Sequence, residues 1–269
     1  MRNVLQAALD RDPKNSDLKG DLIRVEADIG GLEAGLAKAR SFANNDPGNS
    51  LYDVVSAELY ENAGHNREAV ALVDKVAATQ PSDDSLTLAL FRLYTRADDL
   101  AKAEGLLNVR LKADPKDFTI RSALAALYLE QKKYGPALAE YSRLVTERPT
   151  DPAALNNLAW LYQRQGDLPK ARELAERAFA AAPAAASIGD TLGWILLAQG
   201  QPDRAMNYLT AANTAAPRNP EIQYHLAVAL QRVGRTAEAQ AMLETLLGSG
   251  DFFADKADAE KLLRDLKHG

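Results

Sequence analysis

The side chains that could carry out chemistry in this chain are few and lie far apart. Its 269 residues include only three histidines, His65, His225 and His268, and no cysteine. No histidine lies near another, and there is no His-Glu-x-x-His, nucleophile elbow or glycine-rich phosphate loop. The lack of cysteine excludes disulfides, thiolate metal sites and cysteine nucleophiles. We therefore expect no catalytic residues, no metal and no cofactor, and turn to side chains suited to recognition.

The two tryptophans are the first such residues. Trp160 and Trp194 are the only tryptophans and are separated by 34 residues. Exposed tryptophan is enriched at binding hot spots, so the pair could form an aromatic shelf for a peptide side chain or a sugar ring. The alternative is that each indole packs against the next helix of an array.

Amide, aromatic and charged side chains recur near the tryptophans. Asn156 and Asn157 offer both donors and acceptors to a peptide backbone, or are simply hydrated. For His225, a polar contact between helices is favoured over metal binding, because no second ligand lies one helical turn away. The complete candidate binding set is Asn156, Asn157, Trp160, Gln163, Arg164, Asp190, Thr191, Trp194, Tyr224, His225, Gln231 and Arg232.

A second, charged set lies in the N-terminal half. It comprises Arg24, Glu58, Arg92 and Arg96. Arg92 and Arg96 are four residues apart, so they share one face of a helix and could meet an acidic partner. An equally good interpretation pairs them with Glu58 and Glu61 in exposed ion pairs that add little stability.

Composition restricts the elements that can position these side chains. Alanine and leucine account for 49 and 39 of the 269 residues, whereas aromatic residues are only 6%. Both dominant residues are strong helix formers, which favours an all-α fold. The net charge of −5 makes nucleic acid an improbable partner. Apolar stretches are far too short for a membrane span, so we expect no direct membrane insertion.

A repeat of 34 residues organises the chain. Prolines recur at this step, and the same step relates a column of alanines, a column of tyrosines continued by leucines, and a column of glycines. These columns predict pairs of antiparallel helices: small alanines let the helices approach, glycine reverses the chain, and proline ends the second helix. The proline column is Pro13, Pro47, Pro81, Pro115, Pro149, Pro183 and Pro217; the alanine column is Ala69, Ala103, Ala137, Ala171, Ala205 and Ala239; and the glycine column is Gly30, Gly64, Gly166, Gly200 and Gly234, with Asp98 and Lys132 in place of glycine in two repeats.

This pattern resembles the tetratricopeptide repeat (TPR). Residues 152–185 match it best, with Leu155, Leu158, Ala159, Tyr162, Gly166, Ala171, Ala178 and Pro183 in phase. The resemblance implies an all-α, right-handed superhelical solenoid whose concave groove binds an extended peptide or a partner helix. The candidate residues occupy the positions that face this groove. The basic positions of the TPR carboxylate clamp are absent, because Ser122, Ala126, Ser187 and Thr191 occupy them.

The repeat period also predicts the domain organisation. Residues 1–15 match the second helix of a preceding, truncated repeat, which suggests a fragment of a longer array and weak self-association through the uncovered helix. Residues 254–269 have leucines at helical spacing and are expected to form a capping helix. The seven repeats between them are placed at 16–49, 50–83, 84–117, 118–151, 152–185, 186–219 and 220–253.

A narrower resemblance concerns the last hundred residues. The run Asp190-Thr191-Leu192-Gly193-Trp194 and the segment 223–230 are similar to the C-terminal part of bacterial TPR lipoproteins of exosortase/PEP-CTERM exopolysaccharide systems. This likeness implies a periplasmic or outer-membrane-anchored parent protein; without it, the location would be cytoplasmic. The expected function is a non-catalytic protein-interaction scaffold, and the alternative is a segment of an export machine whose groove contacts polysaccharide or a synthase.

Overall fold

The computed structural model describes residues 1–79 and 82–268, and these residues form sixteen α-helices and no β-strand. Pro81 of the proline column lies outside the described residues. In chain order the helices are α1 (Arg2–Arg11), α2 (Ser16–Gly30), α3 (Leu32–Asn45), α4 (Leu51–Asn62), α5 (Asn66–Ala77), α6 (Asp84–Arg96), α7 (Leu100–Ala113), α8 (Phe118–Glu130), α9 (Tyr134–Glu147), α10 (Pro152–Gln165), α11 (Leu168–Ala181), α12 (Ala186–Ala198), α13 (Pro202–Ala215), α14 (Pro220–Arg232), α15 (Thr236–Gly248) and α16 (Lys256–His268).

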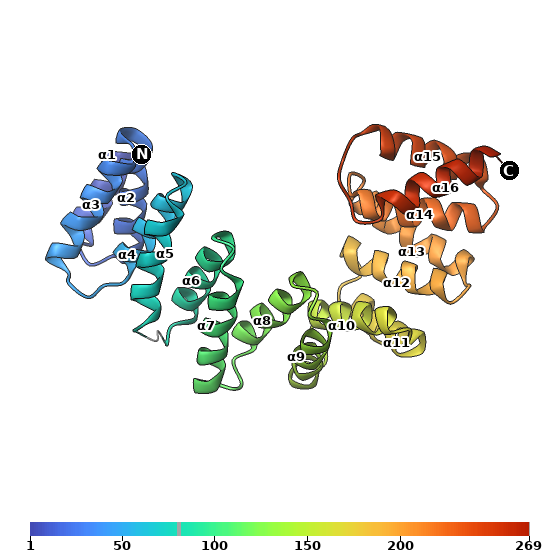
Figure 1. The fold of residues 1–269 in the computed structure, drawn as a ribbon, viewed down its shortest axis with the longest axis horizontal. Coiled ribbons are helices and arrows are strands. Elements are labelled where there is room, and N and C mark those ends of the chain that lie inside the picture. The colour runs from blue at the N-terminus through green and yellow to red at the C-terminus, as the bar shows by residue number, and fades with distance from the viewer. Residues whose placement is uncertain (80–81, 269) are drawn as a thin grey trace. The chain divides into compact units, whose positions relative to one another are not determined.

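Consecutive helices pack as hairpins, as Figure 1 shows along the colour gradient. Each 34-residue segment of the predicted division contains two helices, of which the first also contacts the first helix of a neighbouring segment. The prediction of an all-α solenoid of helical hairpins is confirmed. We call α2, α4, α6, α8, α10, α12 and α14 the first helices.

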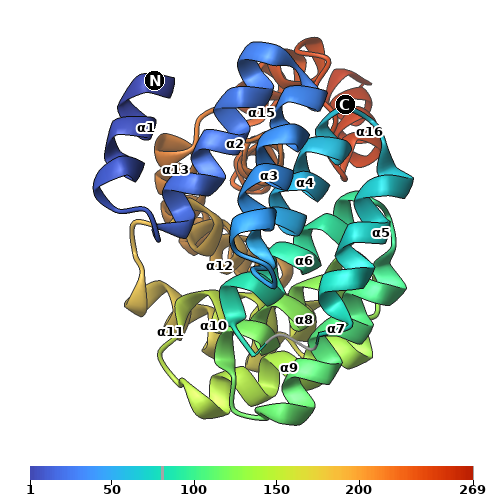
Figure 2. The ribbon, with the colours of Figure 1, turned by 90° about the vertical axis from the view of Figure 1, so that its left-hand side faces the viewer.

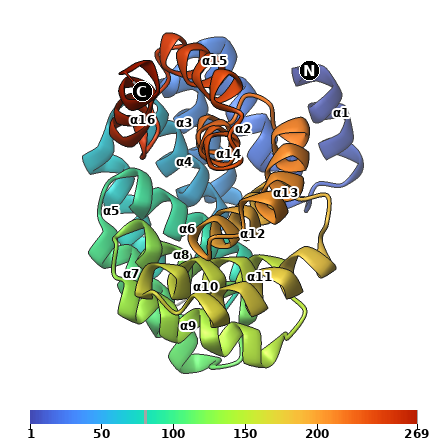
Figure 3. The same cartoon turned by 90° about the vertical axis from the view of Figure 1, so that its right-hand side faces the viewer.

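The chain divides into two compact units, residues 1–132 and residues 133–269. In unit 1, α1 packs along α2 (Figure 2), and the first helices α2, α4, α6 and α8 contact one another in order. In unit 2, α10, α12 and α14 do the same, and α16 packs along α15 (Figure 3). Each unit thus presents its own row of first helices.

The alanine column is buried within the hairpins. Ala103, Ala137, Ala171, Ala205 and Ala239 have no solvent exposure. Leucines of the first helices, such as Leu90 and Leu192, fill the space beside them and are also fully buried. Small and large side chains alternate across each interface, which is how close-packed helices avoid voids.

The glycine column marks the reversals of the chain. Gly166 ends α10 with a φ of 84°, in the left-handed region that glycine adopts without strain. Asp98 and Lys132 adopt φ values of 59° and 56° in the same column. Gly30 differs from the prediction: it is the last residue of α2, and the positive φ of 80° belongs to Gly31. The turn therefore falls one residue later in the first repeat.

Residues that cap the N-termini of the first helices also recur at the 34-residue step. Asn15, Asp83, Asp117 and Asp151 each accept a hydrogen bond from the backbone N–H three residues later. These bonds satisfy donors that a helix start leaves free. Ala185 occupies the same position before α12 and makes no such bond.

Candidate functional site

The candidate binding residues lie on three neighbouring first helices of unit 2. Asn156, Asn157, Trp160, Gln163 and Arg164 belong to α10; Asp190, Thr191 and Trp194 to α12; and Tyr224, His225, Gln231 and Arg232 to α14. The structure brings some of them together in two clusters, one around each tryptophan.

The first cluster surrounds Trp194. Its indole stacks on the His225 ring, with the ring centroids 4.0 Å apart and the planes 16° apart. Nδ1 of His225 lies 2.8 Å from a carboxylate oxygen of Asp190, and Nε2 lies 3.9 Å from one of Asp255. His225 is 8% exposed. The histidine thus joins α12, α14 and the segment before α16 in a buried polar contact.

The C-terminal segment covers the α14 end of this cluster. The rings of Tyr224 and Phe253 lie 6.4 Å apart. Burial, reinforced by the charges of Asp258 and Asp255, raises the pKa of Tyr224 to about 12. Gln231 and Arg232 line a cavity of about 230 Å³ together with residues of α16. Part of the candidate set therefore faces the C-terminal helix.

The second cluster surrounds Trp160. Its ring packs edge-on against Tyr134, the first residue of α9, at a centroid distance of 5.8 Å. The Arg164 guanidinium lies 4.5 Å from the centroid of Tyr134 and 5.0 Å from that of Trp160. Both distances suit cation–π attraction. Arg164 is exposed, so this cluster combines aromatic surface with an accessible positive charge. Sequence reasoning missed Tyr134, which occupies none of the groove positions.

The amides of α10 have different surroundings. Asn157 donates a hydrogen bond of 3.0 Å from Nδ2 to the Tyr141 hydroxyl. Burial raises the pKa of Tyr141 to about 12, although the bond from Asn157 acts in the opposite direction. The Oδ1 atom of Asn156 is buried and accepts no hydrogen bond within the described part of the chain.

The remaining candidates of α10 and α12 add little to either cluster. Thr191 donates its hydroxyl hydrogen to the Ser187 carbonyl of its own helix at 2.9 Å. Gln163 is partly exposed on α10.

The charged set in unit 1 is mostly paired internally. Arg24 contacts Glu58 at 2.8 Å, and Arg96 contacts Glu61 at 2.8 Å. The hydrogen bond and charge of Glu61 raise the pKa of Arg96 above its ordinary value. The Arg92 side chain is exposed and forms no ion pair with any described residue. Of the two arginines for which an acidic partner was considered, only Arg92 remains free to meet one.

The described residues were also searched for a metal-binding cluster and for a membrane-spanning helix. Within residues 1–79 and 82–268, no three histidine or acidic side chains lie close enough together to hold a metal ion. None of the helices in these ranges is both long and apolar enough to span a bilayer.

Comparison with solved structures shows the fold. The chain superposes on a tetratricopeptide repeat protein from Parabacteroides merdae with a TM-score of 0.53 and 22% identity, covering 85% of this chain and 91% of that one. For yeast Tom70 the TM-score is 0.61 at 16% identity, covering 99% of this chain and 58% of that one. For a thermophilic TPR protein from Thermus thermophilus the values are 0.53 and 23%, covering 70% and 100%.

Sequence comparison assigns the family. No curated protein is significantly similar in sequence to this chain. The family model described as "Tetratricopeptide repeat" matches residues 43–127, 128–191 and 196–266, which is most of the chain. The 34-residue columns, the helical hairpins and this match agree, and the chain belongs to the tetratricopeptide repeat family.

Proposed function

We propose that this protein is a non-catalytic scaffold that binds an extended peptide or a partner helix on the first helices of unit 2. TPR proteins are generally interaction scaffolds that bind protein partners. The observation that carries the proposal is the Trp160 cluster, where two aromatic rings lie beside the exposed guanidinium of Arg164. Tryptophan, tyrosine and arginine are the side chains in which interface energy concentrates.

The two tryptophans have different surroundings, and this suggests a different role for each. Trp194 is stacked on His225 and packs against the buried cluster of Tyr224, Leu243 and Phe253. Trp160 instead has the exposed Arg164 and the ring of Tyr134 as its neighbours. We therefore assign the main binding contact to Trp160 and a mainly stabilising contact to Trp194.

Single substitutions separate these roles. A partner is first isolated from lysate and envelope fractions, and its binding segment is then titrated calorimetrically. Trp160→Ala should weaken binding by about 2 kcal/mol, or roughly 30-fold, with little change in helicity. Trp194→Ala should lower the melting temperature, because it removes the ring contacts of a partly buried tryptophan with His225 and Tyr224, at a cost of up to about 3 kcal/mol. Arg92→Ala, on the charged set of unit 1, is the control and should leave affinity unchanged. A folded Trp160→Ala variant with unchanged affinity would refute the proposal.

The polysaccharide alternative makes a different prediction for the same face. Aromatic rings also stack on sugars, so Trp160 would contact a glycan in an exopolysaccharide export or assembly system. Soluble exopolysaccharide fragments are titrated alongside the peptide. Glycan binding that depends on Trp160, without any peptide binding, would favour the alternative.

We also propose weak self-association through α1. Val4 is 71% exposed and Leu5 is partly exposed, whereas Leu9 is buried against its neighbours. Val4→Lys with Leu5→Lys should abolish concentration-dependent association in sedimentation experiments, because it places charge on the apolar surface. Leu9 is left intact, since replacing it would disturb packing. Association that survives both changes would have to use another surface.

A further inference from the structure

The arginines in the helical hairpins of unit 2 differ in their pairing according to the helix that carries them. The first helices contain two arginines, Arg164 in α10 and Arg232 in α14, and neither forms an ion pair or donates a hydrogen bond to any described residue. The arginines of the second helices α9, α11 and α13 all contact a glutamate carboxylate. These pairs are Arg143 with Glu140, Arg172 and Arg204 with Glu176, and Arg177 with Glu173. Unpaired guanidinium groups therefore lie on the helices that carry the candidate binding residues.

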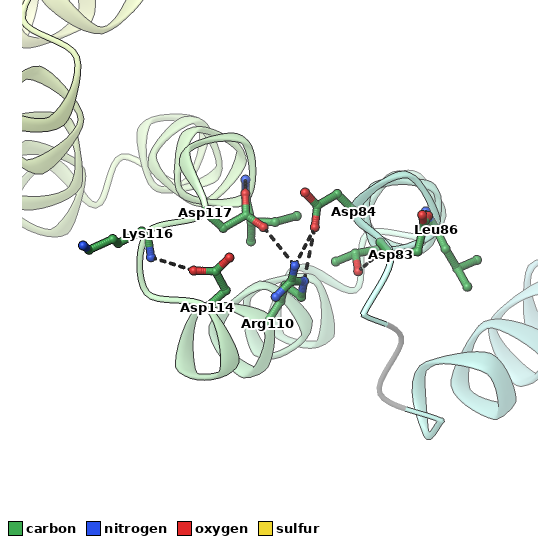
Figure 4. A network of polar contacts seen from close by, with 9 residues as sticks. Asp83, Asp84, Leu86, Arg110, Asp114, Lys116 and Asp117 are labelled. Atoms are coloured by element: carbon green, nitrogen blue, oxygen red, sulfur yellow. Dashed lines mark hydrogen bonds and ion pairs between the residues drawn. The ribbon is translucent and has the colours of Figure 1, made fainter.

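The surroundings of Arg164 contrast with those of a fully paired arginine. Figure 4 shows Arg110 of unit 1 between Asp84 and Asp117, whose carboxylate oxygens lie 2.9 and 3.4 Å from it. Within the described residues, the guanidinium of Arg164 contacts only the aromatic rings of Tyr134 and Trp160, at 4.5 and 5.0 Å from their centroids. The face of a ring attracts a cation but offers it no oxygen acceptor. The N–H donors of Arg164 are therefore left for water or for a partner.

The helix position of Arg164 is shared with Arg232, but their charges are not equally compensated. Both lie in the last turn of a first helix, where the helix dipole favours a positive charge. Asp258 and Asp265 of α16 line the same cavity as Arg232, so nearby carboxylates compensate part of its charge. Arg164 has no carboxylate within ion-pair distance among the described residues. It is therefore the less compensated cation of the candidate set.

The acidic side chains of the same three helices do not balance this cation. Asp190 is the only carboxylate in the candidate set, and it lies 2.8 Å from Nδ1 of His225. The other acidic residue of these helices, Glu221, lies in the first turn of α14, whereas Arg164 lies in the last turn of α10. The whole chain has a net charge of −5, so it does not attract anions in general. A preference for an acidic partner would therefore have to arise locally, at Arg164.

We propose that the peptide segment bound at the Trp160 cluster is acidic, with an aspartate or glutamate carboxylate on Arg164 and an adjoining apolar side chain against Trp160 and Tyr134. This inference rests on the binding role proposed above for Trp160. The carboxylate accepts the N–H donors that Arg164 leaves unused, and a bidentate contact of this kind is among the stronger hydrogen-bonded pairs. The two rings already hold the guanidinium, so binding costs less side-chain freedom. A basic segment is disfavoured, because it brings a like charge to Arg164.

Selection from a library of short random peptides tests the chemistry on the full chain. The peptides are displayed through their C-termini, so that only side chains supply carboxylates, and are selected in parallel on the unmodified protein and on Trp160→Ala. Peptides that need Trp160 should be enriched, relative to the starting library, in aspartate or glutamate beside an apolar residue. Peptides that need Trp160 but show no acidic enrichment would overturn this inference and leave the binding role of the cluster intact. Failure to select any peptide that needs Trp160 would overturn both.

Titration of the strongest selected peptide, synthesised with an amidated C-terminus, tests the contact itself. Replacing its acidic residue by the matching amide should weaken binding about tenfold or more, as should Arg164→Gln, and the two changes together should add little to either alone. Arg164→Lys keeps the charge without the planar fork and should retain part of the affinity. Arg143→Gln removes an equal charge from the second helix α9 and, as the control, should leave affinity unchanged. Full additivity of the peptide and Arg164 changes, or an equal loss in Arg143→Gln, would overturn the assignment of the acidic residue to Arg164.

Discussion

Arg110 stands where the other repeats have an apolar side chain. Phe42, Val76, Leu144, Ala178, Ala212 and Leu246 occupy the corresponding positions. The Arg110 side chain is largely buried and is held by Asp84 and by the more deeply buried Asp117. Desolvation offsets much of the attraction within such a buried ion pair. Removing one partner leaves the other charge buried and unpaired, which destabilises the fold strongly, whereas replacing both partners costs little.

Single and double substitutions at this ion pair should therefore differ in their effect on stability. Arg110→Ala leaves two neighbouring carboxylates without their cation and should destabilise the protein by about 3 kcal/mol. The double variant Arg110→Leu with Asp117→Asn restores residue types found in other repeats and keeps a side chain that can cap α8. It should lie within about 1 kcal/mol of the unmodified protein in urea denaturation. A double variant as unstable as Arg110→Ala would show that the pair itself is needed.

The pH dependence of stability should carry the signature of Asp117. Burial and the Asp84 carboxylate raise its pKa, so the folded state holds the proton more tightly than the unfolded state does. This carboxyl group therefore contributes stability at low pH that is lost as the pH rises through its folded pKa. Relative to the unmodified protein, Asp117→Asn should gain stability as the pH rises from about 4 to 7. Urea midpoints of both proteins across this range provide the measurement, and the opposite trend would contradict the assignment.

Sequence reasoning at the residue scale placed the candidate residues on the first helices but did not give their contacts. The spacing made Trp160 and Trp194 equivalent, yet one packs beside Tyr134 and Arg164 and the other stacks on His225. A 34-residue period fixes the position of a residue within its repeat. Its surroundings depend on neighbours that differ between repeats, such as Tyr134, and these cannot be read from the period.

At the scale of elements, glycines inside helices have two distinct roles. A Cβ atom on Gly193 of α12 would lie 2.5 Å from Cγ of Leu209 on α13, so this glycine allows the two helices to approach closely. A Cβ atom on Gly105 of α7 would meet nothing within 4 Å. Both residues are equally unfavourable for their helices, and only packing distinguishes them.

Alanine substitutions at these two positions should have opposite effects. Gly193→Ala forces Leu209 away and should cost about 1–3 kcal/mol despite the better helix propensity of alanine. Gly105→Ala meets no obstacle and should stabilise the protein by up to about 1 kcal/mol. Thermal melts of the two variants compare the same chemical change in two helices. Stabilisation by both substitutions would show that α12 and α13 are not in close contact.

The elements were largely predictable because each repeat column has a local physical cause. Proline ends helices, glycine permits a positive φ, and alanine permits close approach, so the helices followed from residue types at fixed spacing. The column of capping residues that includes Asp117 and Asp151 was also visible in the sequence but was not used. The position of the turn in the first repeat was predicted one residue too early. Gly30 and Gly31 are adjacent, and residue type alone cannot tell which of two consecutive glycines adopts the positive φ.

At the scale of the whole molecule, stability in a repeat array is approximately a sum of local terms and nearest-neighbour interfaces. Cooperativity between distant repeats is then limited, and a local defect should remain local. This chain offers a way to observe that, because both tryptophans lie in unit 2 and none in unit 1. Tryptophan fluorescence therefore reports on unit 2, whereas far-ultraviolet circular dichroism reports on all helices.

Arg110→Ala should shift the urea transition seen by circular dichroism more than the one seen by tryptophan fluorescence. Its expected loss of about 3 kcal/mol falls in unit 1, so part of the helical signal should disappear about 1 M or more earlier in urea. The fluorescence transition should move far less, because Trp160 and Trp194 remain in repeats whose own contacts are intact. Gly193→Ala, in unit 2, provides the reciprocal control and should move the fluorescence transition directly. Equal shifts of both signals in Arg110→Ala would mean that the chain unfolds as one cooperative body, and the local description of its stability would then be wrong.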